Sequence, residues 1–241
     1  MSTTTARGCP PGERPAGRAA GSQRWTRLAF VHWEVDADRV APLLPDGLEV
    51  DEHDGRTFVG VVPFEMRDIR ASWMPRPLAL DFLETNLRCY VRANGEPGVF
   101  FFSLEASSWL AVKVARLQWG LPYHHAAMTL EESDGVVTAE STRRGSDAML
   151  RLRYRIGEPL GPSAPGSLEH FLLERYLLFC EKRGRLVRGQ VYHEPYPAHA
   201  AELLEIEETL TSAADIGMDA PPAHIHHAPG VQVEVFSPTP L

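Results

Sequence analysis

Lysine is almost absent from this sequence of 241 residues, because only Lys113 and Lys182 are lysines among its 24 basic residues. A mechanism that needs a lysine amine therefore has two side-chain candidates. Cysteine is also scarce. Cys9, Cys89 and Cys180 are odd in number and do not form a disulfide framework. We therefore expect reduced thiols in a cytoplasmic protein.

An excess of positive charge and long apolar runs are lacking too. The net charge is −8 at pH 7, and the isoelectric point is about 5.7. Polyanion-binding proteins present a basic surface, so nucleic acid and anionic membranes are disfavoured as partners. Apolar runs such as residues 99–104 are far shorter than the about 20 residues that span a bilayer. The first residues also lack the apolar stretch of a secretory signal.

Several motifs of cofactor and metal sites are missing. The sequence has no phosphate-binding glycine loop, no Gly-x-Ser-x-Gly, no Cys-x-x-Cys and no His-Glu-x-x-His. Two histidines at i and i+2 in 224–227 (HIHH) could share a metal on a strand. However, Pro221, Pro222 and Pro229 indicate an irregular segment, and no carboxylate is close in sequence. We predict no metal and no cofactor.

The pattern along the chain predicts a disordered tail followed by one domain. Residues 1–22 are rich in Gly, Pro, Ala and Arg and lack periodicity, and residues 23–241 form the domain. Helical spacing marks 107–119, and the longest helix is expected at 167–183, between Ser167 and Gly184. Asn94-Gly95 and Asp134-Gly135 are hairpin signals. Strand-like segments occupy 25–34, 56–66, 82–92, 99–105, 125–131, 136–143, 150–156, 186–193, 203–208 and 231–236.

This succession of short, turn-linked strands favours a β-rich α+β fold. We predict an antiparallel sheet, closed or nearly closed as a β-barrel, with a few flanking helices. An apolar fraction of 44% is enough for one sizeable core or two small ones.

A polar row stands out in the segment 82–92. Glu84, Asn86 and Arg88 alternate, so all three face one side of a strand. One interpretation is a solvated outer face with a cross-strand ion pair. The other is a barrel interior that holds an acid–base group and an anion clamp.

A second candidate lies where the helix near Arg116 ends. After a Gly-Leu-Pro turn, Tyr123, His124 and His125 begin a strand. Such a cluster could transfer protons near neutral pH, or it could be aromatic packing at a barrel rim. The local sequence leaves both interpretations open.

Taken together, these segments closely resemble the YqjF-like family, a bacterial domain of unknown function. The resemblance covers most of residues 24–236. It is carried by 30–36 (FVHWEVD), 44–48 (LPDGL), 61–64 (VVPF), 84–91 (ETNLRCYV), 98–104 (GVFFFSL), 121–123 (LPY), 174–176 (ERY) and 193–197 (HEPYP).

More distantly, the chain is similar to acetoacetate decarboxylase, whose fold is a compact β-barrel with an interior, largely apolar active site. Residues 45–51 match its Pro-Glu-Pro-Leu-Glu-Ile-Asp turn, Glu84 matches a strand glutamate, and Arg116 falls on the arginine of its Gly-Arg-Glu. The decarboxylase also uses a first-strand arginine, for which Arg27 and Arg24 are the nearest candidates. Its two adjacent lysines, one of which forms the Schiff base, correspond to Tyr123 and His124.

Tyrosine and histidine cannot form that imine, so the resemblance implies the fold and the pocket but not the decarboxylase reaction. We predict a lyase-, dehydratase-, cyclase- or isomerase-type enzyme that acts on an oxo acid or related carbonyl compound. Glu84 would be the acid or base, and Tyr123 and His124 would carry the proton or donate to an enolate. Candidate substrate-binding residues are Arg88, Arg116, Arg27 and Asn86.

The alternative is a non-catalytic small-molecule-binding barrel that has lost the lysine. Because decarboxylase relatives assemble, a homo-oligomer is compatible with the resemblance. Roles for Lys113, His193 and 224–227 are left open.

Overall fold

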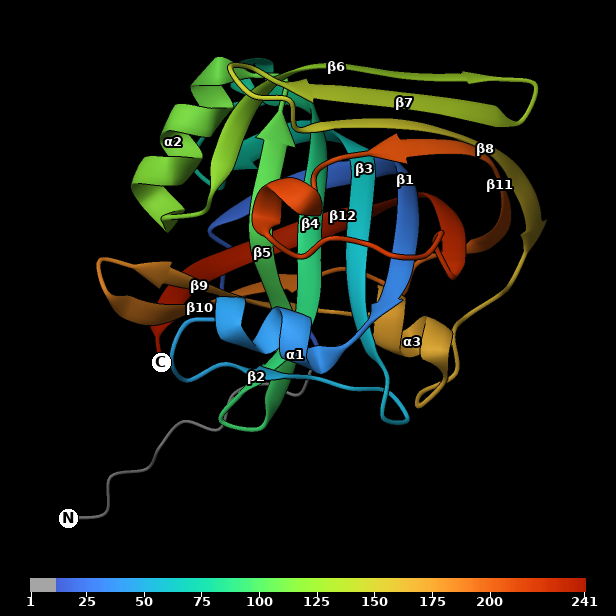
Figure 1. Cartoon of the computed structure of the whole chain (residues 1–241). Coiled ribbons are helices and arrows are strands. Elements are labelled where there is room, and N and C mark those ends of the chain that lie inside the picture. The colour runs from blue at the N-terminus through green and yellow to red at the C-terminus, as the bar shows by residue number, and fades with distance from the viewer. Residues whose placement is uncertain (1–11) are drawn as a thin grey trace.

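The computed structural model of the chain describes residues 12–241, apart from the side chains of four residues in one helix. The fold is mostly β-sheet with few helices, as predicted (Figure 1). The strands are β1 (Gly21–Val35), β2 (Glu49–Val50), β3 (Thr57–Ala71), β4 (Leu80–Ala93), β5 (Glu96–Ala106), β6 (Tyr123–Ser133), β7 (Val136–Arg143), β8 (Met149–Pro159), β9 (Leu177–Lys182), β10 (Arg185–Tyr192), β11 (His199–Glu208) and β12 (His224–Pro240).

The helices are short and peripheral. Figure 1 shows α2 (Trp109–Trp119) beside the start of β6, whereas α1 (Ala37–Val40) and α3 (Leu168–Leu173) lie at the opposite end of the sheet. None of the helices in residues 12–241 has the length and apolar character needed to cross a membrane. The single-turn 3₁₀ segments are η1 (Ala41–Leu43), η2 (Arg76–Leu78) and η3 (Ser212–Ala214).

The strands pair in the order β10-β9-β5-β6-β7-β8-β11-β12-β1-β3-β4-β2, with further pairings β10–β12 and β5–β4. Because of these two extra pairings, the hydrogen-bonded strands form two closed circuits. One runs through β6, β7, β8 and β11, and the other runs through β9 and β10. Both share β12, β1, β3, β4 and β5.

Two pairings correct the expectation of a wholly antiparallel sheet. β5 is parallel to β6 and also to β9. Parallel neighbours need a crossover connection rather than a tight hairpin. Helix α2 supplies it between β5 and β6: its N-cap Ser108 accepts a hydrogen bond from the amide of Ala111, and Gly120 ends it with φ of 73°.

The predicted long helix at 167–183 is wrong. Ser167 caps α3 as expected, but α3 ends at Leu173, and β9 begins at Leu177. The run Leu177–Cys180 fits a helix and a strand equally well. Pairing with β5 on one side and β10 on the other favours the strand. Gly184, with φ of 71°, belongs to the β9–β10 turn rather than to a helix end.

The boundary of the expected tail also differs. β1 begins at Gly21, which pairs with Val235 of β12, so ordered structure starts within the segment predicted to be disordered. The amide of Ala20 donates to the carbonyl of Val235, and Arg14 pairs with Glu234. These long-range partners are invisible in local composition. Residues 1–11 lie outside the described residues.

Hairpin signals in the sequence are confirmed. Asn94 and Gly95 adopt φ of 50° and 79° between β4 and β5, and Asp134 and Gly135 do the same, at 52° and 73°, between β6 and β7. Positive φ at both central residues matches the right-handed twist of the flanking strands. This hairpin sets the register of β4 against β5, which shifts once, between Leu87 and Arg88.

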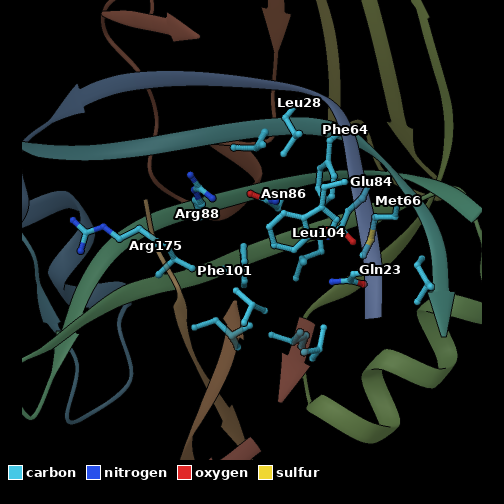
Figure 2. Close-up of a pocket in the computed structure, with 18 of the residues that line it drawn as sticks. Gln23, Leu28, Phe64, Met66, Glu84, Asn86, Arg88, Phe101, Leu104 and Arg175 are labelled. Atoms are coloured by element: carbon cyan, nitrogen blue, oxygen red, sulfur yellow. The ribbon is translucent and has the colours of Figure 1, made fainter. Parts of the chain in front are cut away.

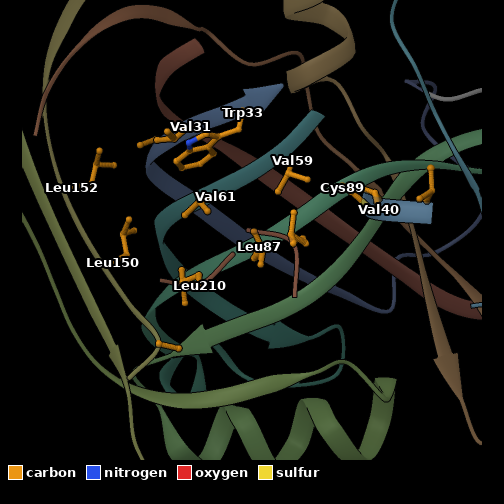
Figure 3. Packing of buried hydrophobic residues seen from close by; sticks show 14 of the residues in the cluster. Val31, Trp33, Val40, Val59, Val61, Leu87, Cys89, Leu150, Leu152 and Leu210 are labelled. Atoms are coloured by element: carbon orange, nitrogen blue, oxygen red, sulfur yellow. The ribbon is translucent and has the colours of Figure 1, made fainter. Parts of the chain in front are cut away.

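β4 is buried on both faces. Its odd positions Leu87, Cys89 and Val91 belong to the largest apolar cluster, with Val59, Val61 and Leu150 from other strands (Figure 3). Its even positions face the opposite side. A strand that alternates between two buried environments can thus hold polar groups without presenting them to bulk water.

Candidate functional site

A pocket of about 280 Å³ lies on the even-numbered face of β4 (Figure 2). Aliphatic and aromatic side chains form most of its wall. The apolar lining includes Trp25, Leu28, Phe30, Val62, Phe64, Met66, Phe82, Val99, Phe101, Leu104, Leu121, Leu177, Val191 and Tyr196. The polar row Glu84, Asn86 and Arg88 lines the same pocket and is buried, so these side chains face the interior rather than solvent.

Glu84 is the buried acid of the pocket, with 3% of its surface exposed. Its Oε2 accepts a hydrogen bond of 2.7 Å from the Tyr123 hydroxyl. Burial raises the pKa of the carboxyl from 4.5 to about 7, although the Tyr123 hydroxyl and the Asn86 amide partly offset that rise. Glu84 can therefore gain or lose a proton near neutral pH.

Tyr123 reaches Glu84 from two strands away. Glu84 pairs with Ala106 of β5, and Leu104 of β5 pairs with Tyr123 of β6. Burial raises the pKa of the Tyr123 phenol well above 10, and the Glu84 carboxylate adds to that rise. The phenol thus stays protonated and acts as a hydrogen-bond donor.

Arg88 is the buried cation of the pocket, with 8% of its surface exposed. Its Nη2 donates to the carbonyl oxygen of Leu172 at 3.1 Å and lies 3.4 Å from the Tyr90 hydroxyl. No carboxylate of the described residues forms an ion pair with it, and its Nε has no hydrogen-bond partner among them. A buried charge without a counterion is costly, so this group is poised to bind an anion.

Arg175 also lines the pocket, on the same side as Arg88. Unlike Arg88, it has a carboxylate partner, because its Nη1 lies 2.7 Å from Oδ2 of the buried Asp51. Asp51 also accepts from Arg92 at 2.6 Å. Burial lowers the pKa of Arg175, and Asp51 opposes that effect.

Three predicted site residues lie away from the pocket lining. His124 follows Tyr123 on β6 and faces the other side, where burial and the nearby Arg143 lower its pKa to about 4. Arg116 donates from Nε to the backbone carbonyl of Tyr123. Arg27 sits at an irregularity of β1, pairs with Glu65 at 3.1 Å and donates to the carbonyl of Leu130. Arg24 does not line the pocket either.

Lys113 does not line the pocket. Its side chain is exposed on α2, and its amine lies 4.0 Å from the ring centre of Trp109. Its helical position relative to Arg116 therefore does not bring it to Glu84.

The histidines of 224–227 begin strand β12 rather than an irregular loop. His227 Nδ1 is 2.9 Å from the Tyr154 hydroxyl. In residues 12–241, no group of three or more His, Cys, Asp or Glu side chains has the arrangement of a metal site.

His193 packs beside the pocket wall. Its ring centre lies 4.7 Å from that of Tyr176 and 4.5 Å from that of Tyr196. Its Nδ1 donates to the carbonyl of Glu194 at 2.8 Å.

Sequence reasoning missed Arg175. The Glu-Arg-Tyr motif lies inside the helix predicted for 167–183, where its direction toward the pocket cannot be inferred. The only signal for it is Asp51, in the turn that matches the decarboxylase, because an aspartate buried there requires a cation.

Known proteins resemble this chain over nearly its full length. It is 34% identical over 209 residues to the uncharacterized protein YqjF of Bacillus subtilis (strain 168), which covers 86% of each chain. Among solved structures it is similar to an acetoacetate decarboxylase-like enzyme from Sphingomonas wittichii RW1, at 17% identity and a TM-score of 0.66, over 98% of this chain and 99% of that one. It is also similar to the enduracididine biosynthesis enzyme MppR complexed with pyruvate, at 14% identity and a TM-score of 0.64, over 96% and 94%.

The two structural likenesses place the fold among acetoacetate decarboxylase-like structures. Residues 22–232 match the DUF2071 family, described as an uncharacterized conserved protein. This match and the 34% identity to YqjF agree in extent. The chain therefore belongs to the DUF2071 family.

Proposed function

We propose that this protein is an enzyme that binds an oxo acid or a related carbonyl compound and acts by acid–base chemistry without a lysine imine. One observation carries the proposal. Arg88 is a buried cation that has no acidic partner among residues 12–241, and Glu84 is a carboxyl whose pKa is about 7; both lie on the same wall of one pocket. The strand circuits support an acetoacetate decarboxylase-like barrel as the scaffold.

The proposed chemistry begins with transfer of one proton. The Glu84 carboxylate takes a proton from the carbon next to the substrate's carbonyl group, which leaves an enolate and a neutral carboxyl. Returning the proton at another atom gives isomerisation, and loss of a leaving group from the neighbouring carbon gives a lyase or dehydratase reaction. Arg88 binds the substrate's carboxylate, and the protonated Tyr123 hydroxyl keeps Glu84 oriented.

The proton-transfer step can be tested without the natural substrate. We would incubate the protein in D₂O with oxo acids of three to ten carbons and follow exchange of the carbon-bound hydrogens next to the carbonyl by NMR. We expect Glu84→Gln to slow this exchange ~10²-fold or more. Glu140→Gln, at an exposed carboxylate, is the matched control. Equal exchange rates in Glu84→Gln and the unmodified protein would refute the role of Glu84.

A non-catalytic binding protein is the second candidate. It is favoured by one feature: Glu84 is already held inside the protein by Tyr123 and Asn86, as a purely structural carboxyl would be. Tight binding of an oxo acid with no exchange for any member of the series would select this candidate.

A further inference from the structure

We infer that the ligand is an elongated monocarboxylate whose carboxylate and reacting carbonyl carbon are separated by about five bonds or more. The inference rests on the proposed function for the reacting end, beside Glu84. It excludes short 2-oxo and 3-oxo acids, in which one or two bonds separate these groups, as preferred ligands.

The spacing of the polar row sets the length. Glu84 and Arg88 are four residues apart on β4, whose pairing with β3 is continuous through this stretch. The Cα atoms of residues four apart on an extended strand are separated by about 13 Å, and we take this as the separation of the two side-chain ends. A hydrogen bond of about 3 Å at each end leaves about 7 Å for the ligand itself. With carbon–carbon bonds of about 1.5 Å in a zigzag chain, that length corresponds to five or six bonds.

The Arg88 side chain does not shorten this span. Its guanidinium group contacts the Tyr90 hydroxyl and the Leu172 carbonyl, and Tyr90 lies further along β4 in the direction away from Glu84. Figure 2 shows Arg88 and Arg175 on one side of Asn86 and Glu84 on the other. The cationic and acid–base ends of the pocket are thus distinct.

Beside Asn86, both neighbouring strands present apolar side chains to the pocket. The cross-strand neighbours of Asn86 are Val62 on β3 and Leu104 on β5, and both line the pocket. They suit a hydrocarbon segment. The Asn86 Oδ1 atom, which has no hydrogen-bond partner in the described part of the chain, can accept one hydrogen bond from a hydroxyl group on it.

Volume and charge agree with this length. A pocket of about 280 Å³ is near the lower end of the about 300–1,000 Å³ typical of small-molecule sites, which a seven-carbon oxo acid suits. Arg175 has Asp51 as a carboxylate partner, although Asp51 also pairs with Arg92. Arg88 is the cation among the described pocket residues that has no carboxylate partner, which suits it to bind the carboxylate of the ligand.

Two isomers provide the test. 6-Oxoheptanoate and 2-oxoheptanoate have the same atoms and charge, but five bonds and one bond, respectively, separate the carboxyl carbon from the ketone carbon. We expect the 6-oxo isomer to exchange hydrogen for deuterium next to its ketone ~10-fold faster or more, because misplacement of a reacting carbon slows proton transfer. Faster exchange of the 2-oxo isomer would overturn the inference.

A binding series separates this inference from the proposed chemistry. Saturated carboxylates from propanoate to decanoate contain no reacting carbonyl, and we expect their affinity to rise about fourfold per methylene up to six to eight carbons. Affinity that does not rise with length would overturn the elongated ligand. If affinity rises but Glu84→Gln leaves the deuterium exchange of 6-oxoheptanoate unchanged, the proposed chemistry fails while the ligand class holds.

Arg88 is tested at the other end. We expect the methyl ester of 6-oxoheptanoate to bind the unmodified protein roughly 10- to 100-fold more weakly than the acid, since a charge-assisted hydrogen bond is lost. Arg88→Met should remove this difference, whereas Arg88→Lys should keep part of it. The ester comparison needs no variant and is unaffected if Arg88→Met does not fold. Equal binding of acid and ester would refute the carboxylate site.

Discussion

Glu84 should make the stability of this protein fall as the pH rises from about 4.5 to 7. Burial raises the pKa of its carboxyl from 4.5 to about 7. Between these values the unfolded chain has lost the proton, while the folded chain retains it. The folded state then binds more protons than the unfolded state, so the free energy of unfolding decreases with increasing pH.

The size of the effect follows from the same values. Each pKa unit is worth ~1.36 kcal/mol, so the rise from 4.5 to about 7 corresponds to about 3 kcal/mol. This stability is present in full below pH 4.5 and is lost once the pH exceeds the folded-state pKa. Glu84→Gln removes the titration but keeps the shape, and its amide oxygen can still accept from the Tyr123 hydroxyl.

Urea unfolding of the unmodified protein and of Glu84→Gln, at half-unit steps from pH 4.5 to 9, measures the effect. The difference between their unfolding free energies isolates Glu84, because other titrating groups are common to both proteins. We expect the unmodified protein to lose about 3 kcal/mol relative to the variant between pH 4.5 and 7 and to show no further change above pH 8. A difference that is constant or rises with pH would refute a buried, protonatable Glu84.

Three further predictions concern other residues. Asp51→Asn leaves the buried Arg175 without its counterion and should lower the free energy of unfolding by about 3–5 kcal/mol, measured in urea, whereas Glu140→Gln at an exposed pair should change it by less than about 1 kcal/mol. In Gly98→Ala the new Cβ would lie 2.6 Å from the Phe179 ring, so thermal unfolding should show a loss of about 1–3 kcal/mol, and an unchanged melting temperature would contradict this packing. Lys113 is exposed on α2, so Lys113→Met should retain full activity. Borohydride should trap no adduct in this variant or in the unmodified protein; an adduct on the Lys113 peptide in mass spectrometry would show a relocated nucleophile.

Local patterns in the sequence were sufficient for most strands and for the polar row. Alternation placed Glu84, Asn86 and Arg88 on one face, and Asn94-Gly95 fixed the hairpin that carries them. Whether that face was inside or outside depended on distant strands, so the sequence alone left this open. Only the resemblance indicated that Tyr123 and Glu84 share a site, because 39 residues separate them in the sequence.

The failures arose where a non-local partner decided the structure. The spacing of residues 177–180 is compatible with a helix, but they form a strand because they pair with β5 and β10. Residues 21 and 22 lack a local signal for a strand, yet they pair with Val235 and Glu234. His124 was predicted with Tyr123 because the two correspond to the decarboxylase's adjacent lysines, but adjacent residues of a strand face opposite sides. Arg27 was predicted from the resemblance and Arg116 from its place at the helix end and the resemblance; neither lines the pocket, because Arg27 donates to the carbonyl of Leu130 and Arg116 to that of Tyr123.

The place of β12 in the sheet has a consequence for how the chain acquires its structure. This last strand pairs with β1, β10 and β11, and Gly21 meets Val235. A ribosome adds about 5–20 residues per second, so β1 cannot pair with β12 until synthesis of the chain is nearly complete. Contacts of such sequence separation slow folding, and until they form, the edges of three strands are open to other chains. A truncation that removes β12 should therefore yield aggregation instead of a smaller soluble domain.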